Sequence, residues 1–312
     1  MRMRALLVMN PKATSTTERT REVLAHALAG ELDTVIGETA YRGHAMELAR
    51  AAAEDGVDLI VALGGDGTVN EVVNGILTAE LPEGAARSDL GVVPGGSTNV
   101  FARALGLPND PVEATGVLLD AIHENRRRPV SMGLADDRYF TFTAGYGFDA
   151  AVVGIVEERR SAGHKSTGSL YIRSALRHYW NGLDRRNPPI GMRLGDGTEI
   201  PRLFMAIVTN TSPWTYLGNK PIVITPDSSF EDGLDMFGVT GMSGRAALRI
   251  VRQMFTSADK LVRGKNVTVH HDLTEFTLTA QVPTDFQVDG DHLGLRESVT
   301  FRAIRDALRV AM

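Results

Sequence analysis

The chain of 312 residues contains no cysteine, and this absence excludes disulfide bonds, thiolate metal sites and a cysteine nucleophile. An excess of basic charge is also missing, because the formal net charge at pH 7 is -5. Binding to a nucleic-acid backbone requires a basic face, so we expect no nucleic-acid partner. The lack of disulfides fits a reducing compartment, and we expect a cytoplasmic protein.

Long apolar runs are absent as well. No stretch reaches 18 consecutive apolar residues, so we expect no helix that spans a membrane. Residues 1–11 combine basic residues with an apolar core of about five residues, which is shorter than that of a secretory signal, and we interpret them as a first strand. The hydrophobic content of 43% is enough for a substantial core, and the length favours two domains.

Residues 1–130 alternate apolar, strand-like runs with helical periodicity, which predicts an open α/β sheet. In such sheets, ligands bind at the carboxyl ends of the strands. The expected strands and helices are, in chain order, Ala5–Met9, Thr17–Ala29, Thr34–Gly37, Ala45–Asp55, Leu59–Leu63, Val69–Thr78, Leu90–Val93 and Val112–Ile122.

Residues 131–297 shift toward a period of two, which predicts a mainly β domain with two helices, Ser169–Leu183 and Gly244–Leu261. Residues 298–312 contain two short strand-like runs, Val299–Phe301 and Leu308–Met312, which we expect to return to the first domain. The other expected strands are Arg138–Ala144, Leu203–Thr209, Met236–Thr240, Val267–His270, Glu275–Ala280 and Phe286–Val288.

The run GGDGTVNEVVNG at residues 64–75 follows an apolar strand directly. Gly64, Gly65 and Gly67 let the backbone approach a polyanion, and the next helix offers unpaired amides and the positive end of its dipole. Asp66 would repel phosphate unless a divalent cation lay between them, so the run favours a metal–nucleotide complex. It matches neither GxxxxGK[ST] nor GxGxxG. The plainer interpretation is a glycine-rich turn between a strand and a helix.

Together with PGGSTNVFAR at residues 94–103, this run resembles the diacylglycerol kinase catalytic family, which includes sphingosine and ceramide kinases. The resemblance spans nearly the whole chain and implies a nucleotide-binding lobe, a β-sandwich lobe, and an ATP- and Mg²⁺-dependent lipid kinase. Five further segments follow in the family's order: NP at 10–11, Thr39 ahead of GHA at 43–45, GFDA at 147–150, DGLD at 232–235 and VDGD at 288–291.

The resemblance also implies a nucleotide site in which two glycine-rich loops hold the phosphates and Asp66 meets the catalytic magnesium. Asn70 and Glu71 either contact the nucleotide or only support the loop. Taken alone, Asn10 and Thr39 are typical turn or helix-cap residues. The implied nucleotide contacts are Asn10, Pro11, Thr39, Gly64, Gly65, Asp66, Gly67, Thr68, Asn70, Glu71, Gly95, Gly96, Ser97 and Thr98.

Phosphoryl transfer to an alcohol needs a group that accepts the hydroxyl proton. By resemblance this general base is Asp291 in VDGD, at a position where the family most often has glutamate, and Asp289 is the second candidate. Because AspGly is a strong hairpin signal, the same residues are also compatible with a simple turn. The resemblance further suggests that Asp149 helps to steer the base or a nearby cation.

Residues 229–235 gather Glu231, Asp232 and Asp235 in one turn, a pattern typical of a hard-cation site or of a solvated acidic turn. By resemblance, Asp232 would hold a second, structural magnesium together with backbone oxygens near Ser229 and Leu234.

Residues 157–186 mix basic and aromatic side chains, which favours a patch that faces a membrane. Helical spacing of apolar residues in the same stretch instead favours packing on the β domain, with Arg173 and Arg177 left outside. The basic and aromatic residues are Arg159, Arg160, Lys165, Arg173, Arg177, Arg185, Arg186, Tyr171, Tyr179 and Trp180, and the helically spaced ones are Ile172, Leu176, Tyr179 and Leu183.

These patterns favour a kinase that works peripherally at the inner face of the membrane, with diacylglycerol as the first expected acceptor and sphingoid bases or other lipids as alternatives. GGDGT loops also occur in NAD kinases and phosphofructokinases, whose acceptors are soluble. Val100, where many family members have aspartate, and the replacement of glutamate by Asp291 are also compatible with a lipid carrier or a regulatory nucleotide binder without catalysis. Assembly as a homodimer is left open.

Overall fold

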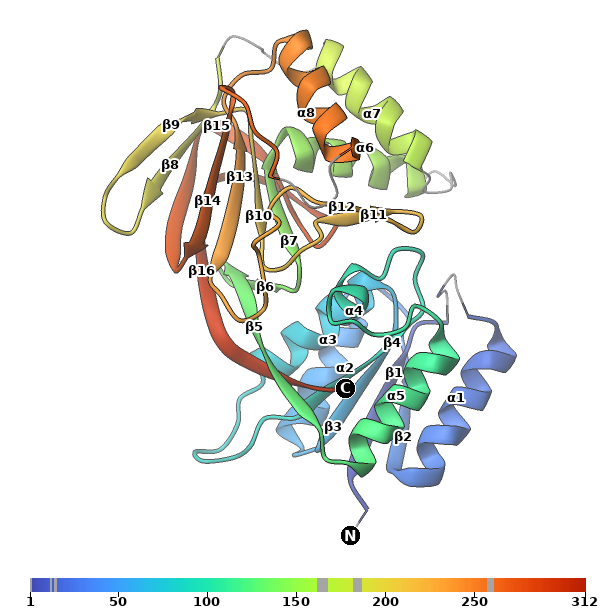
Figure 1. Ribbon diagram of the computed structural model, residues 1–312. Helices are drawn as coiled ribbons and strands as arrows, with labels where there is room; N and C mark the ends of the chain where they lie inside the picture. The colour runs from blue at the N-terminus through green and yellow to red at the C-terminus, as the bar shows by residue number, and fades with distance from the viewer. Residues whose placement is uncertain (1, 12, 14–15, 162–167, 182–186, 257–260) are drawn as a thin grey trace. The chain divides into compact units, whose positions relative to one another are not determined.

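The computed structural model describes the chain except at residues 1, 12, 14–15, 162–167, 182–186 and 257–260 (Figure 1). The chain folds into two compact units. Unit 1 comprises Met1–Ser131 together with Arg305–Met312, and unit 2 comprises Met132–Ile304.

Unit 1 is built on a parallel sheet with the strand order β4–β3–β1–β2. All residues of β3 and β4 are buried, as expected for parallel strands covered on both faces. Helices α1 and α5 pack on one face through Leu24, Leu28 and Leu118, while α2 and α3 lie against the other (Figure 1). The elements are β1 (Arg4–Met9), α1 (Glu18–Glu31), β2 (Asp33–Glu38), α2 (His44–Glu54), β3 (Leu59–Gly64), α3 (Asp66–Thr78), β4 (Asp89–Pro94), α4 (Val100–Ala104) and α5 (Pro111–His123).

Local sequence signals determine where the two helices of the first face begin. Thr17 caps α1, because its hydroxyl accepts a hydrogen bond from the third backbone amide that follows, at 3.1 Å. Asp110 caps α5 in the same way, and Pro111 occupies the first helical position, where its missing N–H costs nothing.

Unit 2 is an antiparallel sheet that follows the order β14–β13–β10–β7–β15–β16, with β8 and β5 pairing as branches. Phe140, Tyr146, Phe276 and Phe301 centre one buried cluster, and a second cluster lies beneath α7 and α8. The elements are β5 (Arg127–Ala135), β6 (Arg138–Phe140), β7 (Thr143–Gly147), α6 (Phe148–Ser161), α7 (Gly168–Asn181), β8 (Ile190–Leu194), β9 (Glu199–Leu203), β10 (Met205–Thr209), β11 (Thr215–Leu217), β12 (Lys220–Ile222), β13 (Leu234–Val239), α8 (Gly244–Thr256), β14 (Val267–Leu273), β15 (Glu275–Val288) and β16 (Asp291–Ala311).

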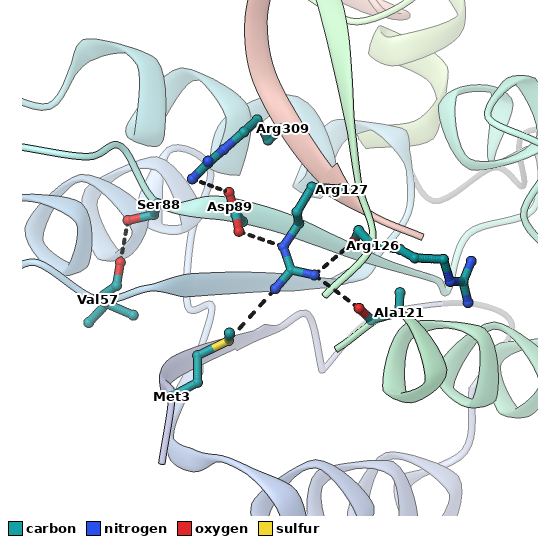
Figure 2. Close-up of polar contacts among 8 residues, drawn as sticks. All are labelled: Met3, Val57, Ser88, Asp89, Ala121, Arg126, Arg127 and Arg309. Carbon is teal, nitrogen blue, oxygen red and sulfur yellow. Dashed lines mark hydrogen bonds and ion pairs between the residues drawn. The ribbon is translucent and has the colours of Figure 1, made fainter. Parts of the chain in front are cut away.

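The chain leaves unit 1 through β5 and returns to it through β16. In unit 1, both segments are bound to the same buried carboxylate, that of Asp89 (Figure 2). Arg127, at the start of β5, donates from Nε to Asp89 at 2.5 Å, and both side chains are only 10% exposed. Arg309, near the end of β16, pairs with the other oxygen of Asp89 at 2.8 Å. In unit 1, Val310 of β16 also pairs in parallel with Leu90 of β4. Asp89 therefore fixes the beginning of one connection and the end of the other.

The predicted fold class, an open α/β sheet followed by a β-rich domain, is confirmed. The prediction of one strand over 138–144 is wrong, because the backbone amides of Thr141 and Phe142 bind the carboxylate of Asp289 and the stretch divides into β6 and β7. Conversely, the two runs predicted within residues 275–288 form the single strand β15, and those within residues 299–312 lie in β16. Sequence reasoning missed β5, α4, α6, β8, β9, β11 and β12.

The predicted packing face of α7 is only partly right. Tyr179 is buried, but Leu176 is 55% exposed. The residues Lys165, Leu183, Arg185 and Arg186, and the side chains of Arg160 and Ile172, lie outside what the structure describes. Among the described helices, none is long and apolar enough to cross a membrane.

Candidate active site

The two glycine-rich loops of unit 1 pack backbone against backbone at the carboxyl ends of β3 and β4. The amide of Gly95 donates to the carbonyl oxygen of Gly64 at 2.7 Å. A Cβ atom on Gly96 would lie 2.6 Å from the Cα atom of Gly65, and one on Gly64 would lie 2.6 Å from the side chain of Thr68. Because these distances are shorter than any carbon–carbon contact allows, the loops require glycine at both positions.

Helix α3 begins at this junction. Its N-cap residue is Gly65, so no side chain of the described residues caps its first turn. The amino end of α3 therefore combines backbone amides with the positive end of the helix dipole, the arrangement that binds phosphate in proteins. Thr68, in the first turn of the helix, is buried, while Ser97 of the second loop is exposed and Thr98 is half-buried.

Asp66 joins the starts of α3 and α4. Its Oδ1 atom accepts a hydrogen bond from the amide of Phe101 at 3.2 Å. Sequence reasoning missed Asn99, which is buried, adopts a left-handed backbone (φ 51°) and forms two hydrogen bonds of 2.8 Å with the backbone of Gly96. Asn99 therefore holds the second glycine loop in shape. The available signal was an asparagine just before a helix, a residue type that tolerates this conformation.

Asn10 and Thr39 follow the neighbouring strands at the same edge of the sheet. The backbone amide of Asn10 donates to Leu63 at 3.1 Å, and its side chain donates to the hydroxyl of Thr68 at 3.3 Å. Thr39 is bound through its amide to Met9 at 2.9 Å, and Pro11 is exposed in the turn after Asn10. The structure thus brings the nucleotide residues predicted for unit 1 to the ends of four adjacent strands.

Glu71 and Asn70 are both engaged in hydrogen bonds. The carboxylate of Glu71 accepts hydrogen bonds from the amides of Gly43 (2.8 Å) and Ala45 (3.1 Å) at the start of α2. Asn70 is buried and accepts from the side chain of Asn74 at 3.1 Å. Of the two roles that the sequence left open, the contacts of Glu71 favour support of the loop before α2, whereas the hydrogen bond of Asn70 lies within α3 and favours neither role.

In unit 2, β15 and β16 are joined by a two-residue turn of Asp289 and Gly290, which have φ values of 47° and 84°. Asp289 is buried, and its carboxylate accepts hydrogen bonds from the amides of Thr141, Phe142 and Thr143 and from the hydroxyl of Thr141, at 2.7 to 3.1 Å. Burial raises the pKa of Asp289, and these hydrogen bonds oppose the rise. Because both oxygens are bound to β6–β7, the contacts favour a structural role for Asp289 rather than a base.

Asp291 is the first residue of β16, pairs with Val288 across the turn and is partly exposed. Gln287 was missed from sequence, and its amide links the turn to α6. Its oxygen accepts from Gly290 at 2.9 Å, and its nitrogen donates to Asp149 at 3.1 Å. Burial raises the pKa of Asp149 to about 6, against the opposing effect of the hydrogen bond from Gln287.

The acidic turn before β13 is divided between two environments. Asp232 is partly exposed and accepts from the hydroxyl of Ser229 at 2.6 Å. Asp235 is buried and bound to His271 of β14 at 2.7 Å, so it is committed to the sheet. Among the described residues, no three His, Asp or Glu side chains gather as a metal site. The predicted set of Asp232 with backbone oxygens of Ser229 and Leu234 offers only hard oxygen donors, which suit Mg²⁺ chemically, and it stays a prediction.

Comparison with known proteins bears mainly on unit 1, which holds the two glycine-rich loops. A family model described as "Diacylglycerol kinase catalytic domain" matches residues 4–135. The Bacillus subtilis (strain 168) diacylglycerol kinase is 39% identical over 149 residues, 46% of each chain. A Chromohalobacter salexigens protein named "Probable lipid kinase YegS-like" is 33% identical over 207 residues, which cover 65% of this chain and 61% of that one.

Residues 4–135 of the chain therefore match the diacylglycerol kinase catalytic family. The chain aligns with about half to three fifths of the length of these two curated relatives. The crystal structure of a diacylglycerol kinase from Bacillus anthracis str. Sterne has the same fold, with a TM-score of 0.71 at 22% identity over 99% of this chain and 97% of that one. The match to the diacylglycerol kinase family model contains every predicted nucleotide residue and ends before Asp149, Asp232 and Asp291.

Proposed function

We propose that this protein is a lipid kinase that transfers the γ-phosphoryl group of ATP to the free hydroxyl of diacylglycerol, giving phosphatidic acid and ADP. The observation that carries the proposal is the pair of glycine loops at the amino end of α3, with Asp66 between them, inside the matched kinase domain. Backbone amides in that position suit a polyphosphate, and the match of residues 4–135 to a kinase family makes ATP the natural donor.

The chain's own residues would divide the work as follows. The amides at the start of α3 and in the loop of Gly95 and Gly96 would orient the phosphates, and Asp66 would hold Mg²⁺ next to them. When bound, Mg²⁺ supplies positive charge that offsets charge on the phosphate oxygens. The acceptor oxygen then bonds to the γ-phosphorus as the bond to the β-phosphate oxygen breaks, and Asp291 takes the hydroxyl proton.

The contacts around Asp291 suit a base that is held in place but still reachable. It lies at the end of a turn that is fixed by Asp289 and Gln287, while its own side chain is partly exposed. A structural Mg²⁺ at Asp232, Ser229 and Leu234 would stabilise the turn before β13. The protein would meet its lipid as a peripheral enzyme at the inner face of the membrane.

The residue at position 100 does not weigh against catalysis. Val100 is 2% exposed at the first position of α4, so its side chain belongs to the packing of unit 1. The contacts that hold the second glycine loop, from Asn99 to Gly96 and from Phe101 to Asp66, are in place with valine at this position.

The test is transfer of labelled phosphate from ATP, with magnesium, to diacylglycerol, sphingosine, ceramide and NAD in mixed micelles. We expect labelled phosphatidic acid. Asp66→Ala should abolish transfer, and Asp291→Asn should lower kcat about 1,000-fold while the affinity for ATP is unchanged, because only proton transfer is lost.

Asp137→Asn is the matched control, since Asp137 is an exposed aspartate of unit 2 outside the proposed machinery. If the label appeared on NAD, the acceptor would be a soluble molecule and not a lipid. Normal turnover by Asp291→Asn would refute the assignment of the base. If no acceptor were labelled, the carrier or regulatory alternative would stand.

A further inference from the structure

Helices α7 and α8 of unit 2 repeat one surface pattern. Each carries arginine and large apolar side chains at positions i, i+3, i+4 and i+7, a spacing that places them on one face of a helix. We call these the outer faces. They consist of Arg173, Leu176, Arg177 and Trp180 in α7, and of Arg245, Leu248, Arg249 and Arg252 in α8.

All eight side chains of the outer faces are exposed, including Leu248 at 71%, Trp180 at 64% and Leu176 at 55%. The opposite sides of the same helices are buried, since Tyr179 of α7 and Ile250 of α8 belong to one hydrophobic cluster. The core of unit 2 is therefore closed without the outer faces. Trp180 contacts the ring of Tyr179 edge to face, but folding does not explain why Leu176 and Leu248 are leucines.

The charge of the two helices is opposite to that of the whole protein. Residues 168–181 and 244–256 contain five arginines and no aspartate or glutamate, whereas the chain as a whole has a net charge of -5. This concentration of one sign around exposed leucine and tryptophan indicates an anionic partner with an apolar layer.

The outer faces lie on neighbouring helices. Figure 1 shows α7 and α8 side by side, and the hydroxyl of Tyr179 donates to the carbonyl oxygen of Met242, just before α8, at 2.9 Å. A partner large enough to cover both helices is therefore favoured over a small ligand.

We propose that the outer faces of α7 and α8 form a docking surface for a bilayer of anionic phospholipid. Arginine side chains would contact headgroup phosphates, while Leu176, Trp180 and Leu248 would enter the interfacial layer, where tryptophan is favoured. A second copy of the chain fits less well, because two such surfaces face to face would oppose arginine with arginine. Docking extends the proposed function by naming its membrane partner, but it does not require phosphoryl transfer.

The test is cosedimentation of the full chain with vesicles that contain neither diacylglycerol nor ATP. We expect binding to equal parts phosphatidylglycerol and phosphatidylcholine, at least tenfold weaker binding to phosphatidylcholine alone, and loss of binding in high salt. The double variant Arg245→Gln/Arg249→Gln should lower the partition coefficient about 25-fold, at about fivefold for each arginine. Arg193→Gln/Arg202→Gln, which removes the same charge from exposed positions of β8 and β9, should change it less than twofold.

The apolar contribution has its own matched pair. Leu248→Ala should weaken binding about tenfold, whereas Leu295→Ala, at an exposed leucine of β16, should not. Failure of the native chain to bind anionic vesicles, or equal losses in the control variants, would overturn the proposal. So would a dimer of the native chain that Leu248→Ala turns into monomers, because the surface would then join two copies.

Transfer to a short-chain, soluble diacylglycerol without vesicles separates this proposal from the proposed function. We expect the variants of the outer faces to retain that activity. If the native chain transferred no phosphate to the soluble diacylglycerol, the kinase assignment would be refuted. The docking proposal would then be decided by the vesicle-binding results.

Discussion

The phosphate loops of unit 1 and the hairpin turn of unit 2 are both fixed tightly, but by different means. In unit 1, backbone packs on backbone, and the absence of side chains at Gly64 and Gly96 is what permits it. In unit 2, the buried carboxylate of Asp289 gathers three amides and a hydroxyl around the turn. The first arrangement appears in the sequence as a run of glycines. The second depends on partners about 146 residues apart in the chain, so no local pattern shows it.

The largest effect should come from removing the carboxylate that holds the turn. Asp289→Ala leaves the amides of residues 141–143 and a hydroxyl without their acceptor, and we expect it to lower the free energy of unfolding by about 5 kcal/mol. The measurement is denaturant unfolding. Asp272→Ala provides the control. The carboxylate of Asp272 accepts a hydrogen bond from the amide of Gly233, but the residue is exposed. Its replacement should therefore lower the free energy of unfolding clearly less than Asp289→Ala does.

If Asp289→Ala unfolded no more easily than Asp272→Ala, side-chain hydrogen bonds would not be what fixes the turn. The contrast with unit 1 would then fail.

A smaller effect should follow from adding a single methyl group to the phosphate loops. In Gly96→Ala the new Cβ would lie 2.6 Å from the Cα atom of Gly65, so the two loops must separate. We expect a loss of stability of about 3 kcal/mol and a large loss of ATP affinity, measured by thermal unfolding and by nucleotide titration.

Gly116→Ala is the matched control in the same unit. Gly116 lies within α5, where a Cβ meets nothing within 4 Å, and alanine is the better helix former, so this variant should be neutral or slightly stabilising. Equal ATP affinity in the two variants would show that the close approach of the loops is not needed for binding.

The same contrast explains which parts of the fold and of the candidate site could be predicted from the sequence. The strands and helices of unit 1 are largely predictable, because periodicity, Thr17 and Asp110 are local signals of where they occur and begin. The division of residues 138–144 into two strands was not predictable, since it depends on Asp289. Asn99 and Gln287 were missed for a related reason: their importance comes from the backbone groups that they reach, Gly96 and Gly290, and not from their residue type.

The last predicted effect appears only as the pH changes, and it concerns the carboxyl group of Asp149, next to Gln287. Since burial raises its pKa from 3.8 to about 6, the folded protein holds a proton that the unfolded chain has already released. Asp149 therefore makes the native state less stable as pH rises from about 4 to about 6, by roughly 3 kcal/mol, after which its contribution is constant. Asp149→Asn should remove this slope. Relative to the native chain, it should be more stable by that amount at pH 7 and no more stable at pH 4, in thermal unfolding across the range, whereas Asp137→Asn should leave the slope as it is. An unchanged slope in Asp149→Asn would mean that Asp149 is charged at little cost, and that Gln287 and the turn, rather than burial, govern its ionisation.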